Sequence, residues 1–185
     1  MYKIGDLIVY EGSSNVCRVS DITKLDQGDQ DRLYYVLRPL HEDCVIYNPV
    51  DNTTALMRPV ISHAEAERLI DMIPEMEAGG AGAQEASNFQ EAKQIAQHYE
   101  SVIKARDCAG LMKLTMSIYE KKQVRAKNDR GIGSVEASAM RRAEEMLFGE
   151  LSVALDIPRD HVRNYIETRL GTPGKLSFSA EKQLH

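Results

Sequence analysis

The chain has 185 residues, of which 43% are hydrophobic and 28% charged, with no tryptophan and a formal net charge of −5. This length fits one large domain or two small ones, and the composition is that of a globular protein. No run approaches the roughly 18 consecutive apolar residues of a membrane-spanning helix, and the N-terminus lacks the apolar core of a signal peptide, so we expect a cytoplasmic protein with no membrane contact.

Short strands dominate the first sixty residues. Segment 16–22 alternates apolar and polar side chains, segment 33–37 is rich in aromatic and branched residues, and the polar, glycine-containing segment 26–31 between them predicts a hairpin. The five predicted strands are 7–10, 16–22, 33–37, 44–47 and 54–57, the last two ending at Asn48-Pro49 and Arg58-Pro59. Five short strands with tight turns predict a small antiparallel β-barrel.

The hydrophobic period changes from two to that of a helix after residue 61. Ser62 is a suitable N-cap, an apolar stripe runs from Ala66 to Ile73, and Pro74 ends the pattern. Small residues then follow in the glycine-rich stretch around Gly79. We therefore place a first domain at 1–74 and a flexible linker at 75–87.

The rest of the chain reads as helices, which makes the predicted fold class α+β. Apolar stripes predict helices that begin near Phe89, Leu111, Ser134 and Val162, with breaks at 128–133 and 156–158. We assign 88–171 to an all-helical domain. The tail, 172–185, lacks periodicity and is expected to be disordered.

Enzymatic and metal-binding motifs are missing from the sequence. Three widely spaced cysteines form neither a disulfide framework nor a zinc pattern, and none of the five histidines lies in a nucleophile motif. The segment His41-Glu-Asp-Cys44 lacks further metal ligands, and Gly79-Gly-Ala-Gly82 lacks the Lys-Ser/Thr of a phosphate loop. We expect a protein that is not an enzyme and that uses no metal or cofactor.

A local excess of positive charge lies in the second half of the chain. Residues 104–142 contain ten basic and four acidic side chains, whereas residues 1–74 contain seven basic and twelve acidic ones. The basic side chains of interest are Lys121, Lys122, Arg125, Lys127, Arg130 and Arg142. They form either a solvated helix end matched to the helix dipole or a face that contacts DNA phosphates, and composition favours neither.

Several motifs together resemble a known family. Ile4-Gly-Asp-Leu-Ile-Val-Tyr10, Tyr34-Tyr-Val-Leu37 and Asn48-Pro-Val-Asp-Asn52 resemble, in this order, the RNA-polymerase-interacting domain shared by CarD/CdnL transcription regulators and the transcription-repair coupling factor. Arg130-Gly-Ile-Gly-Ser134 and the segment 143–151 resemble the helical domain of CarD/CdnL. The resemblance covers about residues 1–155.

This resemblance implies a fold, a partner and a mechanism. A Tudor-like or SH3-like barrel would bind the β subunit of bacterial RNA polymerase, through Lys24, Arg38 and Tyr47 by position. The helical domain would reach promoter DNA at the edge of the melted bubble, where the family wedges a tryptophan into the minor groove.

The chain departs from the family at the wedge itself. It has no tryptophan, and Asn88-Phe89 is the best match to the family's Asn-Trp. The basic pairs that accompany the wedge are replaced by Gln90-Glu91 and Ala137-Ser138. Phe89 is either a weaker wedge or a core residue, and its place in the helical stripe favours the core.

The sequence thus predicts a transcription regulator that binds the polymerase β subunit and modulates open-complex stability at initiation. Its contacts with promoter DNA would depend on polymerase and not on DNA sequence. The alternative is an adaptor of barrel and helices that binds a protein and no DNA. Activation, repression and the oligomeric state stay open.

Overall fold

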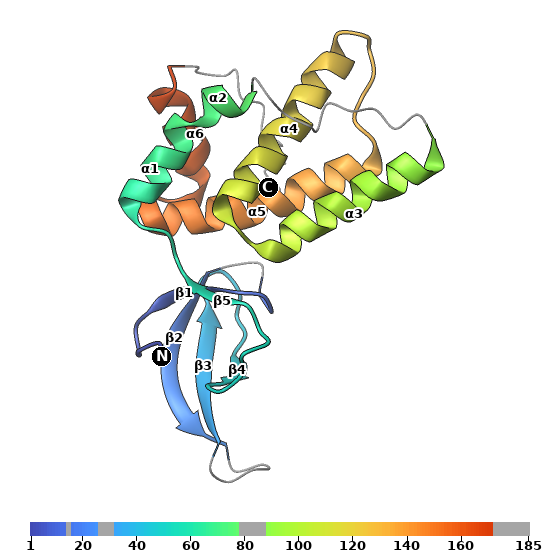
Figure 1. The fold of residues 1–185 in the computed structure, drawn as a ribbon. Coiled ribbons are helices and arrows are strands. Elements are labelled where there is room, and N and C mark those ends of the chain that lie inside the picture. The colour runs from blue at the N-terminus through green and yellow to red at the C-terminus, as the bar shows by residue number, and fades with distance from the viewer. Residues whose placement is uncertain (14–15, 26–31, 78–87, 172–185) are drawn as a thin grey trace. The chain divides into compact units, whose positions relative to one another are not determined.

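The protein is described by a computed structural model that covers residues 1–13, 16–25, 32–77 and 88–171. The chain divides into two compact units, Met1–Ile61 and Ser62–His185. An antiparallel five-stranded sheet occupies the first unit, and six α-helices follow among the described residues of the second (Figure 1). The α+β class predicted from the sequence is confirmed.

The sheet of the first unit has the strand order β4-β3-β2-β1-β5. The strands are β1 Leu7–Tyr10, β2 Val16–Lys24, β3 Leu33–Pro39, β4 Ile46–Pro49 and β5 Met57–Pro59. All four neighbouring pairs are antiparallel, so the predicted hairpin of β2 and β3 is confirmed, while its tip at 26–31 lies outside the described residues. A register shift between Val19 and Asp21 interrupts the β2–β3 ladder.

Closure of the sheet into a barrel is not seen in the strand pairings of the described residues, where β4 and β5 are the two edges. One side chain connects these edges instead: the Asn48 amide donates to the Met57 sulfur at 3.1 Å. The Tyr2 hydroxyl donates to the Met57 carbonyl at 3.0 Å, which attaches the N-terminus to β5. Pro49 and Pro59 lie within the edge strands, where a missing N–H breaks no ladder. The prediction that both strands stop before their prolines is therefore wrong.

One face of the sheet forms the core of the first unit. Ile8, Cys17, Val19, Tyr35 and Leu37 are at most 3% exposed and form one cluster. Their alternation along β1, β2 and β3 is the period expected of strands with one buried face. The other face points to solvent at Arg18 and Arg38.

The second unit is built around a long central helix. The α-helices are α1 His63–Asp71, α2 Ile73–Glu77, α3 Phe89–Ala105, α4 Cys108–Ala126, α5 Ser134–Leu155 and α6 Val162–Arg169. Helix α5 contacts α1, α3, α4 and α6. Completely buried side chains such as Met112, Ile118 and Leu147 fill the space between the helices. In the described part of the chain, no helix is long and apolar enough to cross a membrane.

Local signals fix where several helices begin. Ser62 and Glu65 form a reciprocal capping box at α1, and Asn88 and Asp107 cap α3 and α4 through bonds from Glu91 and Gly110. The predicted cap at Ser62 is confirmed. Pro74 does not end the helical region, because it lies in the first turn of α2, where no backbone donor is needed.

Helix α1 belongs to the helical unit, although the predicted boundary at residue 74 grouped it with the strands. The Arg169 guanidinium donates to both Asp71 oxygens at 2.6 and 2.9 Å and to Glu67 at 2.7 Å, which joins α6 to α1. The hydrogen bonds from Arg169 hold the pKa of Asp71 below the usual range. Of the predicted linker, residues 75–77 are helical and 78–87 lie outside the described residues, as does the tail 172–185.

Candidate contact surfaces

The outer face of the sheet carries two of the three predicted polymerase-contacting residues. Tyr47 on the edge strand β4 pairs with Val36 on β3, and Arg38 lies two residues further along β3. Cross-strand partners share a face, so the Tyr47 and Arg38 side chains lie on the same side of the sheet. Tyr47 is 50% exposed and Arg38 is exposed.

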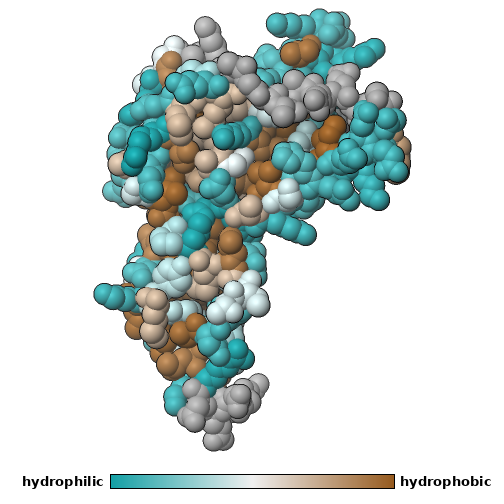
Figure 2. All heavy atoms as spheres, viewed as in Figure 1, coloured by the Kyte–Doolittle hydropathy of each residue, from teal (hydrophilic) through white to brown (hydrophobic). Residues whose placement is uncertain are grey.

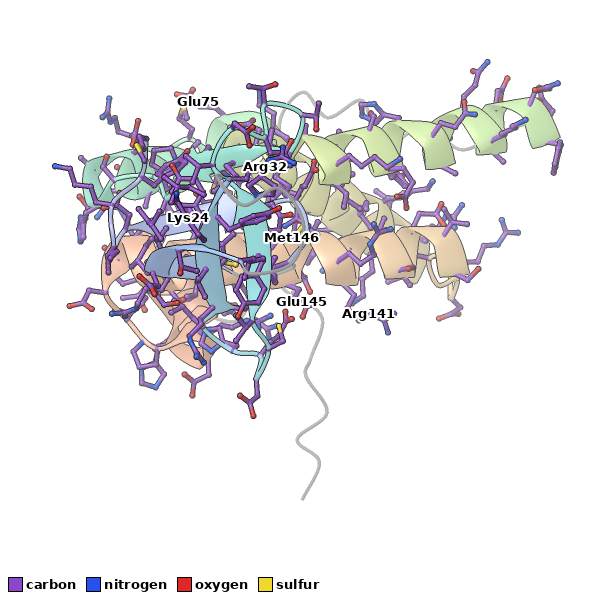
Figure 3. The ribbon with its side chains drawn as sticks, turned by 90° about the horizontal axis from the view of Figure 1, so that it is seen from below. Lys24, Arg32, Glu75, Arg141, Glu145 and Met146 are labelled. Atoms are coloured by element: carbon purple, nitrogen blue, oxygen red, sulfur yellow. The ribbon has the colours of Figure 1, made fainter. Side chains whose placement is uncertain are left out.

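Lys24 does not join this pair. It lies at the end of β2 opposite Leu33, where strand alternation assigns it to the other face, in register with Ile22 and Tyr35. Figure 3 labels it together with Arg32, which precedes β3 at the same end of the hairpin. The structure therefore brings together Arg38 and Tyr47 but not Lys24.

The opening motif of the chain, Ile4 to Tyr10, has a structural role. Gly5 adopts a φ of 96°, a region that residues with a Cβ rarely enter, and its N–H donates to the Val19 carbonyl at 2.7 Å. The Lys3 N–H donates to the Asp6 carboxylate at 2.7 Å, and the Val19 N–H donates to the Asp6 carbonyl at 2.9 Å. This turn starts β1 and sets it against β2.

The motif after β4 has a similar structural role. Asn48 is 2% exposed, and its side-chain carbonyl accepts a bond from the Asn52 amide at 2.9 Å. The Asn52 carbonyl accepts in turn from the Thr54 N–H and hydroxyl, at 3.1 and 2.7 Å. The two asparagines therefore hold the connection between β4 and β5.

Phe89 is exposed, so the interpretation of this residue as part of the core is wrong. It is the first residue of α3, is 83% exposed, and follows the N-cap Asn88. The packed part of α3 begins at half-buried Ile95 and reaches full burial at Tyr99 and Ile103. The start of α3 extends past the start of α5 (Figures 1 and 3), which fits the high exposure of Phe89 as the first residue of α3.

Lys121 faces the interior and cannot supply the predicted phosphate contact. It is 3% exposed, and its ammonium donates to the Glu136 carboxylate on α5 at 2.8 Å. Burial by itself would raise the pKa of Glu136, but the hydrogen bond from Lys121 lowers it below the usual range. The pair joins α4 to α5 and leaves no ammonium for DNA.

Two further cations of the predicted DNA surface are engaged within the helical unit. The Arg142 guanidinium is ion-paired with Glu100, which joins α5 to α3. The Arg125 guanidinium donates to the Gly131 carbonyl at 3.3 Å and so closes the turn after α4. These contacts are structural, and each would have to break or be shared before the side chain could bind a phosphate.

Lys122, Lys127 and Arg130 remain as candidates for DNA contact. Lys127 and Arg130 are exposed and lie in the turn between α4 and α5, beside Asp129 at a left-handed φ of 53°. Hydrophilic side chains dominate the surface at the end of α4 and the start of α3 (Figure 2). Arg141 lies with Glu145 on the side of α5 turned away from α3 (Figure 3).

Residues 2–61 match the family model of the CarD-like/TRCF RID domain. The N-terminal unit is a CarD-like domain. The match ends at the residue where the structure divides, so it covers the CarD-like domain and not the helical unit. It confirms the resemblance seen in the sequence and assigns this domain to the RNA-polymerase-interacting type. A comparison with curated proteins gives no match.

One exposed residue of the CarD-like domain is not among the contacts predicted from the sequence. Arg18 on β2 lies directly opposite Arg38 on β3, on the outer face. The alternation of segment 16–22 places Arg18 on that face, but its partner depends on the register of the hairpin. That register is broken one step later by the irregularity between Val19 and Asp21.

Proposed function

We propose that this protein is a transcription regulator that binds the β subunit of RNA polymerase through its CarD-like domain and modulates open-complex stability. The observation that carries the proposal is the match of residues 2–61 to the CarD-like/TRCF RID domain. The protein acts by binding, without catalysis or a cofactor, and its helical unit approaches promoter DNA.

The outer face of the sheet supports polymerase binding. Arg and Tyr are enriched among residues that dominate protein–protein interfaces, and Arg38 and Tyr47 lie on one face. Strand β4 is an edge of the sheet in the described residues, so its outer backbone groups can pair with a strand of the partner. Backbone pairing tolerates side-chain change, which fits a tyrosine at a position where the family commonly has a basic residue.

The helical unit supports contact with DNA through a small group of side chains. The exposed Phe89 ring supplies an apolar group for a partly unstacked base step, and Lys122, Lys127 and Arg130 supply cations for phosphates. A phenylalanine is smaller than the family's tryptophan, so the wedge is weaker. None of these side chains reads the edge of a base, so the contacts do not depend on the DNA sequence.

The net charge makes the DNA contact depend on polymerase. A charge of −5 repels free DNA, while tethering to polymerase supplies a high effective concentration of the helical unit near the promoter. We therefore expect the free protein to bind duplex DNA poorly at physiological salt.

An adaptor that binds polymerase and no DNA is the second candidate. Lys121, Arg125 and Arg142 are bound to groups inside the helical unit, which reduces the cationic surface on which DNA binding rests. If this candidate is correct, the three remaining cations are only a solvated helix end.

A mobility-shift assay on a forked promoter distinguishes the two candidates. With polymerase present, a regulator that contacts promoter DNA slows decay of the open complex after competitor is added. Without polymerase, the protein leaves the promoter unshifted. An open complex that decays at the same rate with and without a saturating amount of protein would favour the adaptor.

A further inference from the structure

Two arginines face each other across the middle of the CarD-like sheet. Arg18 on β2 and Arg38 on β3 are direct cross-strand partners, and both are exposed on the outer face. Directly opposed residues have Cβ atoms about 5 Å apart, and like charges in this position destabilise a sheet. The pairing is therefore unfavourable in the isolated protein.

Neither guanidinium has a hydrogen-bond or ion-pair partner among the described residues. The nearest acid by register on the same face, Asp21, accepts a bond from the Ile22 N–H at 2.8 Å. Other arginines of the protein are matched: Arg32 pairs with Asp51 at 2.9 Å, and Arg169 pairs with Asp71 and Glu67. Residues 1–61 contain nine acidic and six basic side chains, so the unmatched pair lies in an acidic domain.

We propose that Arg18 and Arg38 form a clamp for a carboxylate-bearing segment of a protein partner. Each guanidinium presents a planar fork of donors that fits a carboxylate, and two forks side by side can hold one glutamate or aspartate from both sides. Binding a carboxylate also removes the repulsion between the arginines. This proposal rests on the proposed polymerase binding. It implies that the polymerase segment bound by the two arginines is acidic.

The surroundings of the clamp favour a protein over a nucleic acid. Leu7 on β1 lies in the same row as Arg18, and Tyr47 lies one step along the same face from Arg38. Arginine together with tyrosine and aliphatic side chains is the composition of a protein interface. DNA carries many phosphates, and all but those at this arginine pair would be repelled by the net negative charge of the domain.

The first test measures the affinity of the full chain for purified core RNA polymerase. Arg18→Gln with Arg38→Gln should weaken binding about tenfold or more, because charge-assisted bonds to a carboxylate are lost. Arg32→Gln is the control, since it removes an exposed, acid-paired arginine just before β3 in the same domain and should leave affinity unchanged. Full affinity in the double variant would overturn the clamp and leave the proposed function standing.

Thermal unfolding of the same variants separates binding from a structural role. Arg18→Gln removes one of two opposed charges and should leave the unfolding midpoint unchanged or raise it. Arginines that held the sheet together would instead give a lower midpoint in each single variant. A lower midpoint together with unaltered polymerase affinity would overturn the proposal.

The last test uses a hexaglutamate peptide and a short DNA duplex as probes of the full chain. The peptide should shift the side-chain NMR signals of both Arg18 and Arg38, and the duplex at equal concentration should not. Shifts with the duplex alone would overturn the choice of a protein carboxylate. If the peptide shifts both signals while the unaltered chain fails to bind polymerase, the clamp is supported and the proposed function fails.

Discussion

Two pairs of basic residues, one in each unit of this protein, differ in their surroundings. On the sheet of the CarD-like domain, Arg18 and Arg38 are exposed and have no partner among the described residues. In the helical unit, which contains the local excess of positive charge, Lys121 and Arg142 are ion-paired between helices. The number of basic residues therefore overstates how many cations the helical unit leaves free, whereas these two arginines of the sheet remain exposed.

The geometry of the two units explains this difference. A helix packed between others points long cationic side chains into the gaps between helices, where acids such as Glu136 and Glu100 are within reach. A sheet with one buried face leaves the other face free, and strand alternation sends every second side chain outward. On this face Arg18 and Arg38 lie opposite each other, and the acid nearest in register, Asp21, accepts a bond from the Ile22 N–H.

The largest expected effect comes from breaking the buried pair of the helical unit. Lys121→Ala leaves the Glu136 carboxylate, whose side chain is 14% exposed, without its partner. We expect a loss of about 3 kcal/mol in the free energy of unfolding, measured by urea denaturation. Lys127→Ala, at an exposed position, should change it by less than about 0.5 kcal/mol. Equal effects of the two changes would show that Lys121 is not structural.

Much of the architecture follows from periodicity, but the partners of the charged residues do not. The stripe Ala66 to Ile73 predicts α1 correctly, yet it does not tell which unit the helix packs against. The sequence therefore predicts a boundary at 74, whereas the structure divides after Ile61. Pro49 and Pro59 signal strand ends unless the strands are known to be edges.

The individual site residues depend on information that is not local. Whether Lys121 or Lys122 faces inward is set by the way α4 packs on α5, and the Arg18–Arg38 pairing is set by a hairpin register. Phe89 fits the helical stripe but lies beyond the packed part of α3. Sequence periodicity predicts which face of a helix or strand is buried. The residue that lies opposite a given side chain is set by how the elements pack.

A second change tests the cations that remain exposed. Reversing Lys127 and Arg130 to Glu should shorten the open-complex lifetime while polymerase affinity stays the same. Each lost phosphate contact should also lower the salt slope of the complex by about 1. The matched control reverses Lys104 and Lys113, two exposed cations outside this turn, for the same change in net charge. An unchanged lifetime at low and high salt would refute the DNA contact.

A third change tests the exposed ring at the start of α3. Phe89→Ala should reduce open-complex lifetime by less than the charge reversal and change the free energy of unfolding by less than about 0.5 kcal/mol, because the ring is not packed. Leu147→Ala, in the core of the same unit, should cost about 2–5 kcal/mol. A Phe89→Ala variant as unstable as Leu147→Ala would return Phe89 to the core.

The smallest expected effect concerns the junction of α1 and α6. The pKa of Asp71 is lowered by its hydrogen bond with Arg169, so this pair adds stability above the unfolded pKa of about 3.9. That stability is lost as pH falls through the depressed folded pKa. The stability difference between the natural chain and Arg169→Gln should therefore shrink on acidification, measured by denaturation at several pH values. A constant difference would contradict the ion pair.

The most direct test of the account is the affinity of the full chain for the isolated polymerase β subunit. We predict a saturable complex that Tyr47→Glu weakens, since this change places a negative charge on the outer face beside Arg38 without altering the sheet core. Lysine at the same position should preserve binding, because the family commonly has a basic residue there. No complex with the β subunit or with core polymerase at micromolar concentration would contradict the central claim.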